Sequence, residues 1–278
     1  MRTVCCTMAL LCLCAWARSG EADEFIRKAR AALDKHDADA AVAAAQKAVE
    51  LAPKSPEAVF TRGDAYAAQR KHAEAIRDYE AALALDKSYL IALDRRGAER
   101  FKLGQIAESI EDFNTYLKAF PKEEPGHWRR GISFYYAGKY AEGAKQFYDG
   151  RTVFGDDVEN AFWHYLCNSR KDGVEKARKQ ILTLEKDDRR VPMMRVHDLI
   201  RGKAKPQDVI ETAESAKLEG GKKTEALFYA NLYVALNYEA EGDAAKAQEH
   251  MARAVEKYPI GHYMWDVANV HLKLMKKQ

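Results

Sequence analysis

The sequence predicts an all-α protein, a right-handed superhelical stack of helical hairpins that ends in a C-terminal capping helix. Residue types recur along the chain at a fixed interval of 34 residues. Only 7 prolines and 16 glycines occur in 278 residues, which leaves little room for long linkers, and 47% of the residues are apolar. A period of this length is typical of helix–turn–helix repeats, which stack because no single pair buries its apolar face alone.

Residues 1–17 are predicted to be a signal peptide. Arg2 supplies a short positive start, and the apolar stretch from Val4 to Ala15 is too short for a stable membrane span. Small residues at Ala15 and Ala17 match the positions that signal peptidase reads. We therefore expect cleavage after Ala17, a periplasmic or secreted protein, and no stable membrane anchor.

Four of the five cysteines lie within this predicted signal peptide. Cys12 and Cys14 each follow a leucine, whereas a bacterial lipoprotein signal requires a small residue before the cysteine. The mature chain keeps only Cys167 and can form no internal disulfide, so helix packing alone must hold the fold. We interpret Cys167 as a small buried residue rather than a reactive thiol.

The 34-residue interval relates four sets of positions, each with its own character. A glycine set is expected where the first helix of a repeat presses on the second: Gly63, Gly97 and Gly131. A set of small residues follows on the second helix: Ala41, Ala75, Ser109, Gly143 and Ala177. A third set is mostly large and is expected to fill the space between repeats: Ala45, Tyr79, Phe113, Phe147 and Ile181. A fourth set marks the exits of the repeats: Pro53, Lys87, Pro121 and Gly155.

These sets divide the chain after the signal peptide into a single repeat domain, residues 18–278. The expected repeats cover 22–55, 56–89, 90–123, 124–157 and a degenerate 158–191. The pattern then fails over 192–227, which is expected to be an irregular helical pair with one helix at Met193–Ile200 and another opening at Pro206. A last clear repeat is expected at 228–261, followed by the capping helix at 262–278.

A glycine in the first helix, an alanine and an aromatic residue in the second and a proline at the exit resemble the tetratricopeptide repeat (TPR) family. Two stretches further resemble NlpI-like periplasmic TPR lipoproteins: Arg130–Gly138 with Trp163–Leu166, and Phe228–Val255. That resemblance implies a homodimeric envelope adaptor that scaffolds peptidoglycan hydrolases and proteases. The chain departs from it by lacking a lipid-accepting cysteine.

In TPR stacks the first helices line a concave groove, and the family's register predicts which side chains face it. Aromatic residues dominate this set, and they suit the capture of a protein or peptide partner because they offer a large contact area at a small entropy cost. The predicted partner-binding residues are Phe60, Phe101, Trp128, Tyr135, Tyr136, Phe162 and Tyr229. An alternative is that several of them pack between repeats instead.

Basic residues also recur, and they form a second candidate surface at Arg95, Arg96, Arg129 and Arg130. The competing interpretation is that arginines one repeat apart, including Arg62 and Arg96, pair with Asp78 and Asp112 on the second helix of their own repeat. The chain has 45 basic and 42 acidic side chains. This near-equal number of positive and negative charges gives no support for nucleic acid as the main partner.

Motifs of catalysis are missing from the sequence. The eight histidines are scattered, and no HExxH, no GxSxG, no phosphate loop and, in the mature chain, no CxxC occurs. We therefore expect a non-enzymatic adaptor without metal or cofactor. Two rivals stay open: a small-ligand-binding protein or enzyme that uses the irregular segment 192–221, and a self-assembling structural module.

Overall fold

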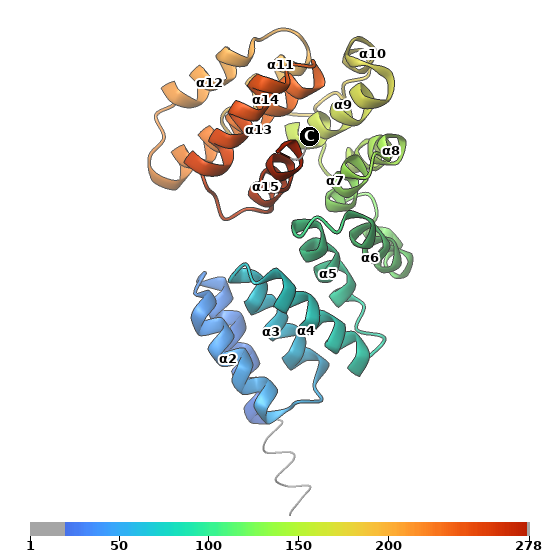
Figure 1. The fold of residues 1–278 in the computed structure, drawn as a ribbon, viewed down its shortest axis with the longest axis vertical. Helices are drawn as coiled ribbons and strands as arrows, with labels where there is room; N and C mark the ends of the chain where they lie inside the picture. The colour runs from blue at the N-terminus through green and yellow to red at the C-terminus, as the bar shows by residue number, and fades with distance from the viewer. Residues whose placement is uncertain (1–19, 277–278) are drawn as a thin grey trace, which may run out of the picture. The chain divides into compact units, whose positions relative to one another are not determined.

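The computed structural model describes residues 20–276, and every regular element in that range is a helix (Figure 1). The chain divides into two compact units, residues 1–119 and 120–278. The predicted signal peptide and its cleavage site lie outside the described residues. No helix within 20–276 is long and apolar enough to cross a membrane.

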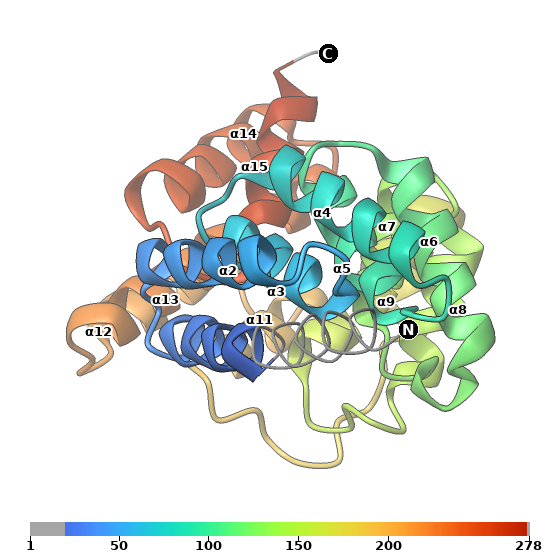
Figure 2. The same ribbon diagram turned by 90° about the horizontal axis from the view of Figure 1, so that it is seen from below.

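Unit 1 consists of three helical hairpins. Residues 20–34 are helical and pack beside α2 through small residues, with Ala29, Ala41 and Ala45 in one buried cluster (Figure 2). The remaining hairpins are α3 with α4 and α5 with α6. The helices after residue 34 are α2 (Ala38–Leu51), α3 (Pro56–Ala68), α4 (His72–Leu85), α5 (Ile91–Lys102) and α6 (Ile106–Ala119).

Local sequence sets where these helices begin and turn. The Ser55 side chain accepts a hydrogen bond from the Ala58 amide at 3.2 Å, and Pro56 occupies the first helical turn, where its missing N–H costs nothing. Within hairpins, the turn places one residue in the left-handed region at 34-residue intervals: His36, Arg70, Gly104 and Gly138. Residue identity does not reveal this fifth repeating position, because two of its four members are not glycine.

The predicted role of the glycine set is confirmed. A Cβ atom built on Gly97 would lie 2.8 Å from a ring carbon of Phe113, and one on Gly63 would lie 2.8 Å from a ring carbon of Tyr79. Gly131 stands in the same relation to Phe147, at 2.7 Å. The second-helix aromatic rings therefore pack directly against the glycines of the first helix, and a side chain at the glycine position would overlap them.

The arginines one repeat apart form the ion pairs that the competing interpretation predicted. Arg62 contacts Asp78 at 2.7 Å, and Arg96 contacts Asp112 at 2.6 Å. Both aspartates are buried, so each pair links the two helices of one hairpin. In the next repeat Gln146 replaces the aspartate and accepts from Arg130 at 2.6 Å.

Unit 2 contains the rest of the helices, and its second half departs from the regular repeat. Its elements are the short 3-10 turn η1 (Pro121–Glu123), α7 (Trp128–Tyr136), α8 (Tyr140–Gly150), α9 (Val158–Asp172), α10 (Val174–Arg178), α11 (Met193–Ile200), α12 (Pro206–Ser215), α13 (Gly220–Ala240), α14 (Ala244–Ala252), the π-helical η2 (Arg253–Lys257) and α15 (Tyr263–Met275).

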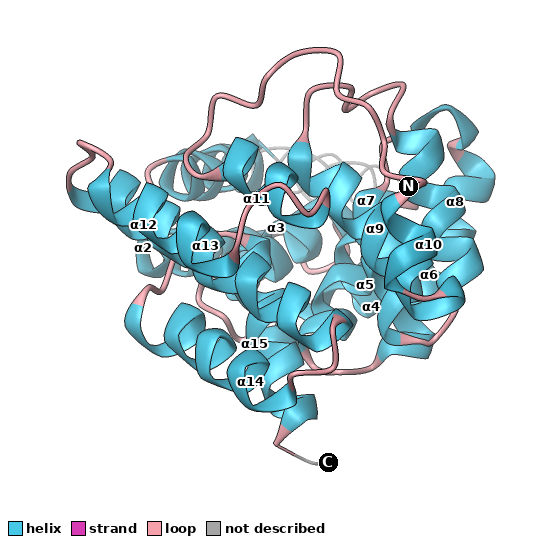
Figure 3. Cartoon of the chain, turned by 90° about the horizontal axis from the view of Figure 1, so that it is seen from above, coloured by secondary structure: helices cyan, strands magenta, loops and turns pink. Residues whose placement is uncertain are grey.

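The largest departure from the expected repeats is at α10, which has only 5 residues. Ala177 is fully buried at its expected small-residue position, but Ile181 lies beyond the end of the helix. The expectation that Ile181 continues the aromatic set of a second helix is therefore wrong. A long loop instead joins α10 to α11 (Figure 3).

The last hairpin is formed by α13 and α14, and α15 follows it. Helix α13 has 21 residues and starts eight residues before the expected repeat, at Gly220. Ten consecutive residues of it, 228–237, are buried, because α9, α12 and α14 all pack on it. Helix α15 buries Val267, Ala268 and Leu272, as expected of a helix that caps a stack.

Candidate functional site

A cavity of about 310 Å³ lies within unit 2, and we call it the aromatic cavity. Six of its thirteen lining residues are Phe, Tyr or Trp: Trp128, Phe147, Phe154, Trp163, Tyr229 and Tyr263. Two aliphatic side chains, Ile132 and Met264, complete the apolar part. The polar part consists of Asp157, Glu159, Asn160, Arg190 and His262.

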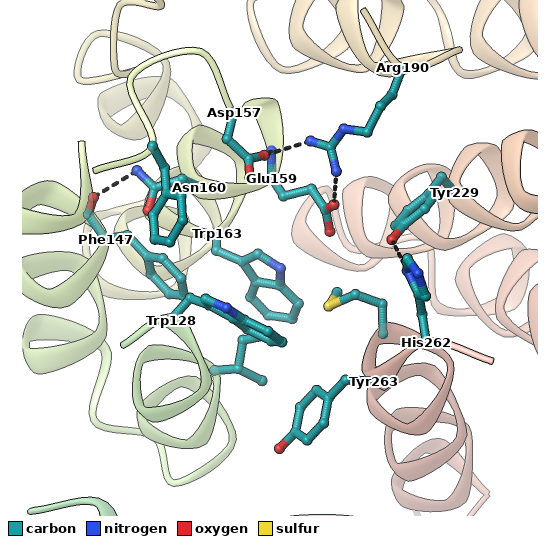
Figure 4. A pocket seen from close by; sticks show the side chains of 13 residues that line it. Trp128, Phe147, Asp157, Glu159, Asn160, Trp163, Arg190, Tyr229, His262 and Tyr263 are labelled. Carbon is teal, nitrogen blue, oxygen red and sulfur yellow. Dashed lines mark hydrogen bonds and ion pairs between the residues drawn. The ribbon is translucent and has the colours of Figure 1, made fainter. Parts of the chain in front are cut away.

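Five helices, α7, α8, α9, α13 and α15, and the segments that precede α9, α11 and α15 bring these side chains together (Figure 4). Trp128 opens α7 and Tyr263 opens α15, and their rings meet edge to face with centroids 5.3 Å apart. Glu159 and Trp163 are four residues apart on α9, so they occupy the same face of that helix. Tyr229 comes from α13, and Arg190 comes from the loop that precedes α11.

Arg190 fixes this loop to the start of α9. Its guanidinium contacts Asp157 at 2.8 Å, Glu159 at 2.5 Å and Asp188 at 2.6 Å. Asp188 in turn accepts a hydrogen bond from the amide of Val158, the first residue of α9, at 3.3 Å. One guanidinium thus serves three carboxylates, which leaves an excess of acceptors at this wall.

Glu159 is the most perturbed acid at the cavity. Burial, reinforced by the nearby Asp157, raises its pKa to about 7, although Arg190 and a hydrogen bond from Tyr233 oppose the rise. The neutral and the charged form are therefore both populated near neutral pH. A cation brought to this carboxylate would favour the charged form.

Trp163 has an unsatisfied polar group at the cavity. Its side chain is only 2% exposed, and among residues 20–276 its indole Nε1–H has no hydrogen-bond partner. Figure 4 shows this nitrogen turned toward the space that Glu159, Tyr229 and Tyr263 border. Across that space the hydroxyl of Tyr229 is hydrogen bonded to His262 Nδ1 at 3.2 Å. A buried donor without an acceptor is costly, so the position suits a ligand that supplies one.

A second cavity of about 380 Å³ lies in the same unit, lined by Tyr135, Tyr136, Tyr140, Arg170, Glu239, His271, Leu274 and Met275. Its polar groups lie close to one another, although His271 Nε2 has no hydrogen-bond partner of good geometry among residues 20–276. The hydroxyl of Tyr136 is 3.0 Å from His271 Nδ1, and His271 Nε2 is 3.3 Å from Glu239 Oε2. Trp163 packs near both Tyr135 and Tyr136, with centroids 5.4 and 6.4 Å away, and so its ring also abuts this cavity's wall.

The seven residues predicted to bind a partner fall into three places. Trp128 and Tyr229 line the aromatic cavity, whereas Tyr135 and Tyr136 line the second cavity. Phe60, Phe101 and Phe162 line neither of these cavities. Phe60 packs on Tyr79 and Tyr89, with centroids 5.4 and 5.2 Å away, while Phe101 and Phe162 have no exposed surface.

The expectation that Phe60, Phe101 and Phe162 face an open groove is therefore wrong. Their positions are on first helices, as predicted, but the side chains turn into the packed interior, so a small error of register separates core from groove. Tyr135 is buried as well: it is 6% exposed and is surrounded by Tyr136, Tyr140 and Trp163.

The candidate basic surface is largely occupied by structural contacts. Arg96 and Arg130 are paired as described above. Arg95 is more open, with its Nε 3.9 Å from Asp64, and the Arg129 guanidinium lies 5.8 Å from the centre of the Trp128 ring. Arg95 and Arg96 belong to unit 1, and Arg129 and Arg130 belong to unit 2.

Glu159, Trp163, Arg190 and Tyr263 were not predicted as site residues. The sequence held one usable signal, the four-residue spacing of Glu159 and Trp163 on a predicted first helix. Nothing in the sequence places Arg190 at that helix, because a loop of irregular path carries it there. The segment 192–221, proposed as an active loop, contributes no residue to the aromatic cavity.

Cys167 is fully buried, and burial raises the pKa of its thiol. Its sulfur would lie 2.8 Å from a Cβ built on Gly143, so it fills a space between helices, as a small core residue does. Burial also lowers the pKa of His164 to about 4, which keeps that imidazole neutral. Within residues 20–276 no group of three or more His, Cys, Asp or Glu side chains could hold a metal ion.

The fold and the repeated contacts define an all-helical repeat protein. Sequence profiles described as tetratricopeptide repeats match residues 26–89 and residues 229–259. These two segments of the chain are therefore similar to tetratricopeptide repeats.

Several solved structures have a similar fold, and one of them is itself described as a tetratricopeptide repeat protein. A tetratricopeptide repeat protein from Parabacteroides merdae has a TM-score of 0.60 and 17% identity, over 92% of this chain and 99% of that one. PilF of Pseudomonas aeruginosa has a TM-score of 0.51 and 12% identity, over 94% and 100%. MamA of Desulfovibrio magneticus RS-1 has a TM-score of 0.53 and 16% identity, over 57% and 90%. At these identities the likeness concerns the fold alone.

Proposed function

We propose that this chain is an exported, non-enzymatic adaptor that binds a partner protein or peptide at the aromatic cavity of unit 2. TPR domains generally mediate protein–protein binding, and this supports the class of function. The observation that carries the proposal is the cavity itself. Rings from α7, α9, α13 and α15 enclose it, and a buried indole donor inside it has no acceptor among residues 20–276.

The cavity has the composition of a binding site for part of a partner chain. Such sites are mostly apolar, with a few polar groups that fix orientation. Tyrosine and tryptophan are also the side chains in which binding energy concentrates at protein interfaces. Trp128, Tyr263 and the exposed His262 border the cavity at the surface, whereas Trp163 and Tyr229 lie inside it, at 2% and 3% exposure.

Export and an envelope location form the second half of the proposal. They rest on the sequence of residues 1–17 and on the resemblance to NlpI-like lipoproteins, which also implies that the chain forms a homodimer and acts with peptidoglycan hydrolases. Under this proposal the partner is itself an exported protein, because both must meet in the same compartment.

A site-specific photo-crosslink tests the binding site. We replace Trp128 with p-benzoylphenylalanine in the native host, irradiate whole cells and identify the attached peptide by mass spectrometry. The matched control carries the same residue at Phe120, which is 40% exposed and does not line the cavity. A partner attached from position 128 and absent at position 120 supports the proposal. The same partners at both positions, or none at 128, would contradict it.

A further inference from the structure

The aromatic cavity carries two unmet requirements, one for positive charge and one for a hydrogen-bond acceptor. Two carboxylates, Asp157 and Glu159, line the cavity, and Asp188 adds a third to the same cluster. Only one guanidinium, that of Arg190, balances their negative charge there. The Nε1–H of Trp163 points into the space and lacks an acceptor within the described part of the chain. A ligand that meets both requirements must hold a cation and an acceptor close together.

The α-ammonium group of a peptide and its first carbonyl oxygen are joined through a single Cα atom. They meet both requirements with the backbone of one residue, whereas a lysine side chain carries its cation four methylenes away from any acceptor. We propose that the aromatic cavity binds the N-terminal residue of a partner peptide, with the α-ammonium at Glu159, the first carbonyl on Trp163 Nε1 and the first side chain against the rings. This inference rests on the proposed function and names the part of the partner that enters.

The contacts around Glu159 leave room for such a cation. One carboxylate oxygen accepts from Arg190 and the other accepts from Tyr233, so each oxygen keeps a lone pair for a further donor. The pKa of this acid, raised mainly by burial to about 7, shows that its charge is under-compensated. The surrounding rings add to the attraction, since ammonium groups bind favourably at the faces of tryptophan and tyrosine.

The size of the cavity agrees with one residue rather than with a long segment. A volume of about 310 Å³ holds a residue with a medium-sized side chain, such as leucine. Trp163 and Tyr229 form the inner wall, while Trp128 and Tyr263 lie where the second and third residues of the peptide would leave.

Calorimetric titration of the full chain with four synthetic peptides tests the proposal. The probes are H-Leu-Ala-Gly-Ser-NH2, its N-acetylated form, its 4-methylpentanoyl form, which lacks the amine but keeps the carbonyl, and Ac-Gly-Ala-Lys-Ala-NH2. We expect the free amine to bind at least tenfold more tightly than the other three. Glu159→Gln should remove most of this difference. Trp163→Phe, which keeps an aromatic ring in place, should weaken the binding of the free-amine peptide several-fold.

Glu175→Gln is the matched control, because that carboxylate is 86% exposed on α10 and lies outside the cavity. Equal binding of the free and acetylated peptides, lost in Trp128→Ala, would overturn the N-terminal assignment while leaving the proposed function intact. Preferential binding of the internal lysine peptide would also overturn it, in favour of a basic side chain. If no peptide binds, the inference fails, and the crosslink from position 128 decides separately whether the proposed function fails with it.

Discussion

At the scale of single residues, the structure shows which repeated positions are dictated by packing and which are free for function. Gly63, Gly97 and Gly131 are required because an aromatic ring occupies the space of a Cβ atom. Arg62 and Arg96, which lie one repeat apart, are held by the buried carboxylates of Asp78 and Asp112 on the following helix. Glu159 and Trp163 follow neither rule: one is a buried acid with too little compensation, and the other a buried donor with no acceptor in the described structure.

Gly97→Val tests the glycine contact. A Cβ atom at this position would lie 2.8 Å from the Phe113 ring, and valine adds two more methyl groups. Overpacking of this kind costs roughly 1–3 kcal/mol. This exceeds the gain in helix propensity from glycine to valine, which is about 0.3–0.5 kcal/mol. We expect a lower melting temperature by circular dichroism. Gly221→Val, at a helical glycine with nothing within 4 Å, should leave the melting temperature unchanged or raise it.

Glu159→Gln tests the buried acid through the pH dependence of stability. The folded-state pKa of about 7 lies above the ordinary value of 4.5, so the folded protein holds this proton more tightly than the unfolded chain. The contribution of Glu159 to the free energy of unfolding is therefore fully present below pH 4.5 and declines as the pH rises to 7. The rise in pKa corresponds to a loss on the order of 3 kcal/mol.

The difference in unfolding free energy between wild type and Glu159→Gln isolates this group from Asp157, Asp188, Arg190 and His262, which are present in both proteins. We expect the two to be equally stable near pH 5 and the variant to be more stable at pH 8, measured by urea unfolding. A constant difference across this range would show that Glu159 has an ordinary pKa.

At the scale of helices and loops, the regular hairpins could be predicted and the site could not. The 34-residue interval identified the glycine contacts, because these depend on packing that repeats along the chain. The cavity depends on what does not repeat: a second helix cut to 5 residues and a loop that returns Arg190 to the start of α9. The same periodic reasoning placed Phe101 and Phe162 in a groove, although a modest rotation about the helix axis buries them.

Arg190→Gln tests how this loop is held. The substitution leaves Asp157, Glu159 and Asp188 facing one another without their guanidinium, and we expect a loss of about 1–3 kcal/mol for this half-exposed group. Amide hydrogen exchange over residues 179–192 should become faster, while exchange in α3 and α4 of unit 1 should not change. Arg189→Gln, at the exposed neighbouring position, is the control and should leave the exchange of this loop at its wild-type rate.

At the scale of the whole molecule, two compact units divide the repeats between them, and the aromatic cavity belongs entirely to the second. Unit 1 contains the most regular hairpins, with buried ion pairs inside them. Unit 2 contains the long α13, the shortened α10 and the loop with Arg190. We infer that regular repeats serve stability in unit 1, and that irregularity in unit 2 creates the binding site.

The proposed export of the chain makes a prediction about its N-terminus. If residues 1–17 are removed by signal peptidase, the protein isolated from its native cells begins at Arg18. Intact mass measurement together with N-terminal sequencing checks this. An intact Met1, or an acylated Cys12 or Cys14, would contradict both the cleavage site and the absence of a lipid anchor.

A crystal structure of the full chain with H-Leu-Ala-Gly-Ser-NH2 tests whether the aromatic cavity binds the N-terminal residue of a partner. We expect the leucine in the cavity, its ammonium within hydrogen-bond distance of Glu159 and its carbonyl oxygen within the same distance of Trp163 Nε1. Peptide bound in the second cavity beside Tyr135 and His271, on unit 1, or in the aromatic cavity with its N-terminus pointing to solvent would contradict the claim.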